Sequence, residues 1–113
     1  MADKAGRFDE AIRQYTLAIE SEEISQSDLV KAHFGRGLVC RKKGNSPENL
    51  ENAIMDFSRV IALDPEHVEA YGERGKAYYI NGESARAEAD SAKEAELRAS
   101  DFRRRQEQMR DQP

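Results

Sequence analysis

The chain has 113 residues, 38% of them hydrophobic and 35% charged, which is enough for one small domain with a single core. A net charge of −4 argues against a nucleic-acid-binding protein that relies on bulk positive charge, and the single cysteine, Cys40, excludes an internal disulfide and a cysteine-only zinc site. No apolar run could span a membrane and no secretory signal follows Met1, so we expect a cytoplasmic protein.

Helix signals occur along the whole chain. We predict helices near residues 7–21, 27–43, 47–63, 66–81 and 84–109. Ser25 is a candidate N-cap, and so are Ser46 and Asp64, each of which is followed by a proline suited to the first helical position. Gly44 and Gly82 suit the left-handed residue just past a helix end. Five helices with short joints leave no sequence for a sheet.

Two sets of residues recur along the chain. One set is the alanines Ala11, Ala53 and Ala87, spaced by 42 and 34 residues, and the other is Gly37 and Gly75, 38 residues apart and each preceded by an arginine. The spacings agree with a unit of 34 residues if four residues are inserted around 45–48 and another four around 22–27.

A helix–turn–helix unit of this length resembles the tetratricopeptide repeat. The small residue of that family's first helix corresponds to Gly37 and Gly75, the alanine of its second helix to the recurring alanines, and the aromatic residue four places further on to Tyr15 and Phe57. The resemblance covers about residues 6–95. It implies an all-α fold, in which antiparallel helix–turn–helix repeats stack as a short right-handed superhelix of about two and a half repeats with a C-terminal capping helix.

The repeats divide the chain into segments. We expect a repeat domain over residues 1–96 and a polar helical extension over 97–113, and the domain consists of a half repeat, 6–26, and two repeats, 27–64 and 65–96. Ser91 and Glu94 are polar where a following repeat would need apolar residues, so the last helix is expected to cap the stack. Phe102 and Met109 share one face of the extension, which is either a solvated tail or a helix that docks on a partner.

The first predicted helix is the second helix of a hairpin, and its partner would precede Gly6. Four apolar residues would then lack their usual cover: Phe8, Ala11, Ile12 and Ile19. Either the chain is a fragment of a larger repeat protein, or another chain or a second copy covers this face. In the second case these residues form an oligomer face.

Close packing of each hairpin requires small residues where the helix axes approach. We expect Gly37 to face Ala53 and Gly75 to face Ala87. Arg36 and Arg74 stand where the family usually has an apolar residue. Their stems are expected to pack while the guanidinium groups reach water.

No catalytic or metal site is predicted. His33 and Cys40 are seven residues apart on one helix, about 10.5 Å along its axis, which is too far for a thiolate–imidazole pair, so both are assigned to the core. His67 has no second metal ligand nearby. Acidic residues surround the arginine run 103–105, which favours a solvated helix face and makes nucleic acid an unlikely partner. We therefore expect a protein that is not an enzyme and needs no cofactor.

The predicted function is protein binding in the concave groove that the first helices of the repeats line. The groove residues are expected to be Lys31, Phe34, Leu38, Arg41, Lys42, Glu73, Lys76, Tyr79 and Ile80. Apolar side chains framed by lysine and arginine favour a protein or peptide with apolar anchors and acidic groups. The alternative is a structural scaffold that self-associates through its uncovered first helix.

Overall fold

The computed structural model describes residues 4–111 and contains five helices. They are α1 (Lys4–Ile19), α2 (Gln26–Lys43), α3 (Pro47–Leu63), α4 (Val68–Ile80) and α5 (Ser84–Arg110). No strand occurs between residues 4 and 111, and the all-α prediction is confirmed. The outermost residues of the predicted segments 1–96 and 97–113, namely 1–3 and 112–113, lie outside this range. No helix of residues 4–111 has the length and apolar character of a membrane span.

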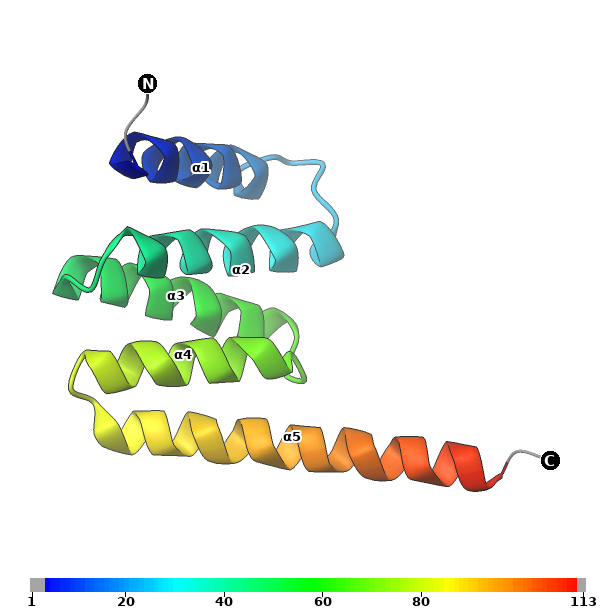
Figure 1. Cartoon of the computed structure of the whole chain (residues 1–113). Coiled ribbons are helices and arrows are strands. Elements are labelled where there is room, and N and C mark those ends of the chain that lie inside the picture. The colour runs from blue at the N-terminus through cyan, green and yellow to red at the C-terminus, as the bar shows by residue number, and fades with distance from the viewer. Residues whose placement is uncertain (1–3, 112–113) are drawn as a thin grey trace.

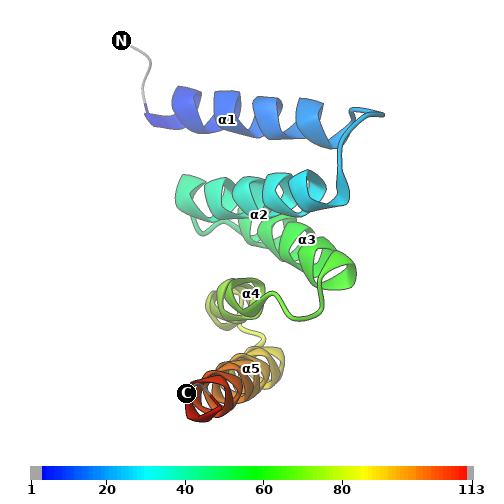
Figure 2. The ribbon, with the colours of Figure 1, turned by 90° about the vertical axis from the view of Figure 1, so that its right-hand side faces the viewer.

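The helices form a stack in which each packs against its neighbours in the sequence, and α2 also contacts α4 (Figure 1). Consecutive helices run in opposite directions because short turns join them. In Figure 2, α1 and α2 lie across the view while α4 and α5 are seen nearly end-on, so the helix direction turns along the stack. Such a turn is what stacked helical hairpins produce.

Two of the helix ends follow the sequence signals closely. The hydroxyl of Ser25 accepts a hydrogen bond from the Asp28 amide at 3.1 Å, and that of Ser46 accepts one from the Asn49 amide at 3.2 Å. After α2, Gly44 has a φ of 153°, which side chains rarely tolerate. The predicted N-caps at Ser25 and Ser46 are confirmed. Gly44 does follow α2, but its ψ of 173° is extended and differs from the left-handed conformation that we expected.

The start of α4 differs from the prediction. The amide of Asp64 still donates to the carbonyl of Val60 at 2.7 Å, so Asp64 ends α3 and does not cap α4. Its carboxylate accepts from the Glu66 amide at 3.2 Å and closes the turn. The cap of α4 is His67, whose Nδ1 accepts from the Ala70 amide at 3.1 Å.

The core lies between α2 and α3. Cys40, Ala53 and Phe57 form a buried cluster, and partly buried side chains pack against it: Ile12, Phe34 and Leu38. The largest fully buried side chains of the described chain belong to α3: Leu50, Phe57 and Val60. The last helix contributes much less, since its buried residues are Ala87 and Asp90.

The two glycines of the hairpins have different neighbours. A Cβ added at Gly37 would lie 2.7 Å from the Phe57 ring, so Phe57 makes the closest approach there, and the predicted pairing of Gly37 with Ala53 stays a prediction. A Cβ at Gly75 would lie 3.3 Å from Asp90 Cβ and 3.5 Å from the Ala87 carbonyl, which confirms that Gly75 faces Ala87. The reason for the difference is the side chain four residues after the alanine, which is phenylalanine in α3 and serine in α5.

The last helix continues well past the N-terminal end of α4 (Figure 1). It runs without a break across residues 96–97, where the predicted repeat domain ends, and its residues 102–110 are exposed. The stack therefore ends in a helix whose last residues, 102–110, are exposed.

Candidate functional site

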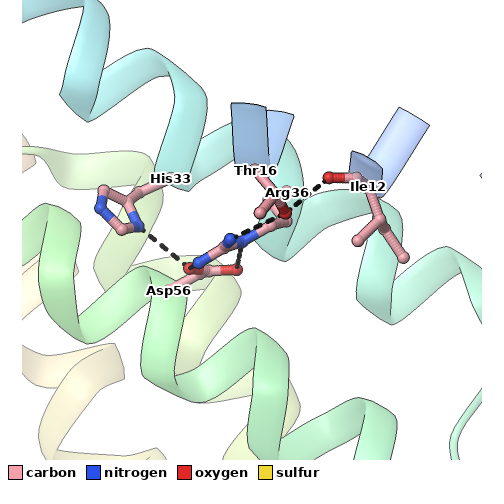
Figure 3. A network of polar contacts seen from close by, with 5 residues as sticks. All are labelled: Ile12, Thr16, His33, Arg36 and Asp56. Carbon is pink, nitrogen blue, oxygen red and sulfur yellow. Dashed lines mark hydrogen bonds and ion pairs between the residues drawn. The ribbon is translucent and has the colours of Figure 1, made fainter. Parts of the chain in front are cut away.

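A buried polar network joins the first three helices (Figure 3). The buried carboxylate of Asp56 in α3 accepts two hydrogen bonds from the Arg36 guanidinium in α2, at 2.9 and 2.8 Å. His33 Nδ1 lies 3.0 Å from the same carboxylate and donates to it, because a carboxylate can only accept. Arg36 also reaches α1, where it donates to the Thr16 hydroxyl at 3.0 Å. One arginine therefore ties α1, α2 and α3 together.

The second repeat contains the same arrangement. Arg74 donates twice to the buried carboxylate of Asp90 in α5, both at 2.8 Å, and once to the Ser58 hydroxyl in α3 at 3.1 Å. Its guanidinium also lies 5.6 Å from the centre of the Tyr78 ring. This arginine ties α3, α4 and α5 together.

Both arginines overturn the expectation that their guanidinium groups reach water. The sequence does carry a signal for the pairs, which our prediction missed. Arg36 precedes Asp56 by 20 residues and Arg74 precedes Asp90 by 16, a difference of four that equals the insertion around 45–48. Each aspartate also follows the recurring alanine of its hairpin by three residues.

The charges of the network shift the pKa values of its members. Hydrogen bonds to the Asp56 carboxylate raise the pKa of Arg36, and those to Asp90 raise the pKa of Arg74. Burial raises the pKa of the Cys40 thiol, and the Asp56 charge raises it further. Cys40 and His33 are both buried, which confirms their assignment to the core. Among residues 4–111, no group of three or more His, Cys, Asp or Glu side chains is placed to hold a metal ion.

The predicted groove residues of α2 divide into two groups. Lys31 and Lys42 are exposed, while Phe34 and Leu38 are partly buried against the core cluster. The Phe34 ring lies 5.7 Å from the Phe57 ring and 4.8 Å from the His67 ring, measured between ring centres. Phe34 thus packs against α3 and the N-cap residue of α4, while Leu38 packs against the core cluster of α2 and α3.

The predicted groove residues of α4 lie beside Arg41 of α2. Arg41 forms an ion pair with Glu73, and its buried Nε has no hydrogen-bond partner in the described chain. Lys76 lies 3.6 Å from the Glu73 carboxylate. Tyr79 and Ile80 are exposed at 71% and 43% of their surface. These two are the most exposed apolar residues of the predicted groove.

An open pocket of about 650 Å³ lies between α4 and α5. It brings together four of the nine predicted groove residues: Arg41, Lys76, Tyr79 and Ile80. Its other wall is α5, which contributes Ser84, Ala87, Glu88, Ser91 and Glu94. The prediction took groove residues from the first helices alone and missed this wall. Serine and glutamate at positions that are apolar in the preceding hairpin are the signal that could have identified it.

The four α1 residues of the predicted oligomer face are partly buried. Ile12 packs against the core cluster of α2 and α3, and α1 as a whole packs on α2. Phe8, Ala11 and Ile19 lie within the same span of α1 and are also partly buried. Part of this face is therefore used inside the chain.

The chain was compared with known proteins. The family model of the tetratricopeptide repeat matches residues 2–53 and again residues 48–103. A human protein, tetratricopeptide repeat protein 13, is 35% identical over 97 residues, which cover 85% of this chain and 11% of that protein. The chain thus spans about a tenth of the length of this relative. The stacked hairpins and these matches agree, and the chain belongs to the tetratricopeptide repeat family.

Proposed function

We propose that this chain binds an extended or helical segment of a partner protein on the concave surface formed by α2 and α4. Tetratricopeptide repeats are typically non-enzymatic modules for protein–protein interaction. The observation that carries the proposal is the exposure of Tyr79 and Ile80 beside Lys76 and Arg41, at the mouth of the pocket between α4 and α5. Exposed apolar side chains in a concave site are typical anchors for a partner.

The charges of this surface favour acidic groups on the partner. Lys31 and Lys42 are exposed on α2 and form no ion pair within residues 4–111. Arg41 also lines the pocket, where its guanidinium forms an ion pair with Glu73. A partner segment with bulky apolar residues and nearby aspartate or glutamate residues would satisfy both features.

A selection from random peptides displayed on phage tests the proposal. We expect the enriched peptides to combine acidic with aromatic or branched aliphatic residues. Their affinity, measured by fluorescence polarisation, should fall about tenfold in Lys31→Glu/Lys42→Glu, because two attractions become repulsions.

The matched control is Arg7→Glu/Arg59→Glu, which changes the net charge equally on exposed parts of α1 and α3. This variant should bind the selected peptides as the unaltered chain does. Equal losses in both variants, or no enrichment, would contradict the proposal. Self-association through α1 has less support, since its four predicted contact residues are partly buried.

A further inference from the structure

The two hairpins of the chain differ at the positions that fill the space between their helices. In α3 the residues are Leu50, Phe57 and Val60, the largest fully buried side chains of the described chain. The equivalent residues of α5, 34 positions later, are Ser84, Ser91 and Glu94, and all three line the pocket. The pocket is therefore the space that large apolar side chains occupy in the preceding hairpin.

The surroundings of the two glycines support this equivalence. The Phe57 ring lies over Gly37, 2.7 Å from the position of an added Cβ. Over Gly75 the nearest side-chain atom is Asp90 Cβ, and the Ser91 backbone nitrogen is 3.9 Å away. Gly75, Ala87 and Ser91 all line the pocket, so no ring among the described residues covers Gly75 as Phe57 covers Gly37.

The same face of α5 carries two exposed apolar residues further along. At 100° per residue, Phe102 points in the same direction as Ser84, and Met109 in the same direction as Ser91. Both lie in the part of α5 that extends past α4, and 63% and 66% of their surfaces are exposed. One face of a single helix thus carries an open pocket in its first half and two apolar side chains in its second half.

The two halves of α5 also carry opposite charge. Residues 84–96 contain four acidic and two basic residues, a net charge of −2, and residues 97–110 contain five arginines and two acidic residues, a net charge of +3. Two such helices attract one another when they lie antiparallel, because each half then faces the half of opposite sign.

We propose that the occupant of the pocket is the second half of α5 from a second copy of this chain. In an antiparallel pair, Phe102 of the second copy lies over Ser91 and Met109 lies over Ser84, since both pairs are seven residues apart. The same register places Glu88 opposite Arg105. Two-fold symmetry forms the contact twice, as in other homodimers. The docked helix runs antiparallel to α5, as α4 does to α3.

This inference rests on the proposed function in one respect, which is that the pocket belongs to a protein-binding surface. Arg41 is the one α2 residue that lines the pocket, so Lys31 and Lys42 lie outside the pocket that the second copy would occupy. Lys31→Glu/Lys42→Glu therefore tests peptide binding without changing a residue that lines the pocket.

Sedimentation equilibrium of the full chain over a range of concentrations tests the proposal. We expect a monomer–dimer equilibrium, and a dissociation constant at least about tenfold higher in Phe102→Ser/Met109→Ser, since the variant loses two buried apolar side chains per contact. The matched control is Leu17→Ser/Met55→Ser, which removes equally exposed apolar side chains from α1 and α3. It should leave the dimer intact. A chain that is monomeric at every concentration, or a dimer lost in the control variant alone, would overturn the proposal.

Two further experiments test the contact between the pocket and the second copy directly. In Ser91→Phe the chain fills the pocket itself, as Phe57 does over Gly37, and we expect a monomer with unchanged helical circular dichroism. Exchanging the charges of Glu88 and Arg105 tests the same contact without filling the pocket. Glu88→Arg and Arg105→Glu should each weaken the dimer, and the two changes together should restore it, whereas additive weakening would overturn the register. A monomeric chain that still binds the phage-selected peptides would refute this inference and leave the proposed function standing.

Discussion

At the scale of single residues, the unusual feature is a charged pair inside each hairpin. Arg36 and Arg74 occupy positions beside the close approach of two helices, and each meets an aspartate in two parallel hydrogen bonds. Two bonds between planar groups fix orientation as well as distance. A hydroxyl of the preceding hairpin, Thr16 or Ser58, accepts the remaining bond and sets the spacing of the stack.

Breaking one of these pairs should destabilise the fold strongly. Asp56→Asn removes the charge that compensates Arg36 and leaves the guanidinium partly buried beside a neutral amide. We expect the free energy of unfolding to fall by about 3 kcal/mol. Urea denaturation followed by circular dichroism measures it.

The control for this prediction is Asp101→Asn. It removes the same charge from an exposed pair with Arg105, whose atoms are 3.0 Å apart. That change should cost less than about 1 kcal/mol. Equal costs for the two variants would mean that the buried network contributes no more than a surface ion pair.

The two hairpin glycines should respond differently to the same substitution. In Gly37→Ala the new methyl group meets the buried Phe57 ring at 2.7 Å, and we expect a net loss of about 1–2 kcal/mol after the helix-propensity gain of alanine. In Gly75→Ala the nearest atom is 3.3 Å away, so the two effects nearly cancel. Thermal unfolding of both variants measures the difference. A larger loss for Gly75→Ala than for Gly37→Ala would contradict the wider spacing above Gly75.

The sequence alone does not show these residue contacts. Repeat spacing identifies which positions are equivalent, and it placed Gly75 correctly against Ala87. It does not reveal that Asp56 and Arg36 meet, because the two lie on different helices and the direction of each side chain depends on how the helices pack. Solvation of Arg36 was therefore the wrong expectation.

At the scale of elements, helix bounds were largely predictable because the caps are local. Ser25 and Ser46 satisfy amide groups three residues away, and such a signal is complete within a short stretch of sequence. The start of α4 was not predicted, because Asp64 can cap a new helix or close a turn after the old one. The hydrogen bond from the Asp64 amide to the Val60 carbonyl shows that Asp64 ends α3. This bond forms only because α3 continues as far as Leu63.

The packing of α2 on α3 should make stability depend on the ionisation of Cys40. Burial raises the pKa of this thiol in the folded chain above its unfolded value of about 8.5. Below the unfolded pKa both states keep the proton and stability is unaffected. As the pH rises through the unfolded pKa toward the folded one, the unfolded state loses the proton first and the fold is destabilised.

Cys40→Ala removes this dependence while other titrating groups stay the same. We therefore expect the free energy of unfolding of the unaltered chain to decline more steeply above about pH 8.5 than that of the variant, measured by urea denaturation at a series of pH values. Parallel curves throughout the alkaline range would show that the thiol is as accessible in the folded chain as in the unfolded one.

At the scale of the whole molecule, stability should decrease away from the centre of the stack. Each helix packs mainly on its sequence neighbours, and the core cluster lies between α2 and α3. In such a linear arrangement, an end can open without disturbing the middle. The half of α5 beyond α4 has the least support, because its residues 102–110 are exposed.

Hydrogen exchange followed by mass spectrometry tests this gradient. In a dilute, monomeric sample, amides of residues 102–110 should exchange first and those of α3 last, since α3 carries the fully buried Leu50, Phe57 and Val60. At concentrations where the proposed dimer forms, protection should rise at 102–110 and around the pocket residues of α5, and should stay unchanged in α1. Equal protection of α3 and the end of α5 in the dilute sample would contradict the gradient. Hydrogen exchange of residues 102–110 therefore tests both the stability gradient and the dimer. These residues are the most exposed part of α5 within one chain, and they are the part that a second chain would cover.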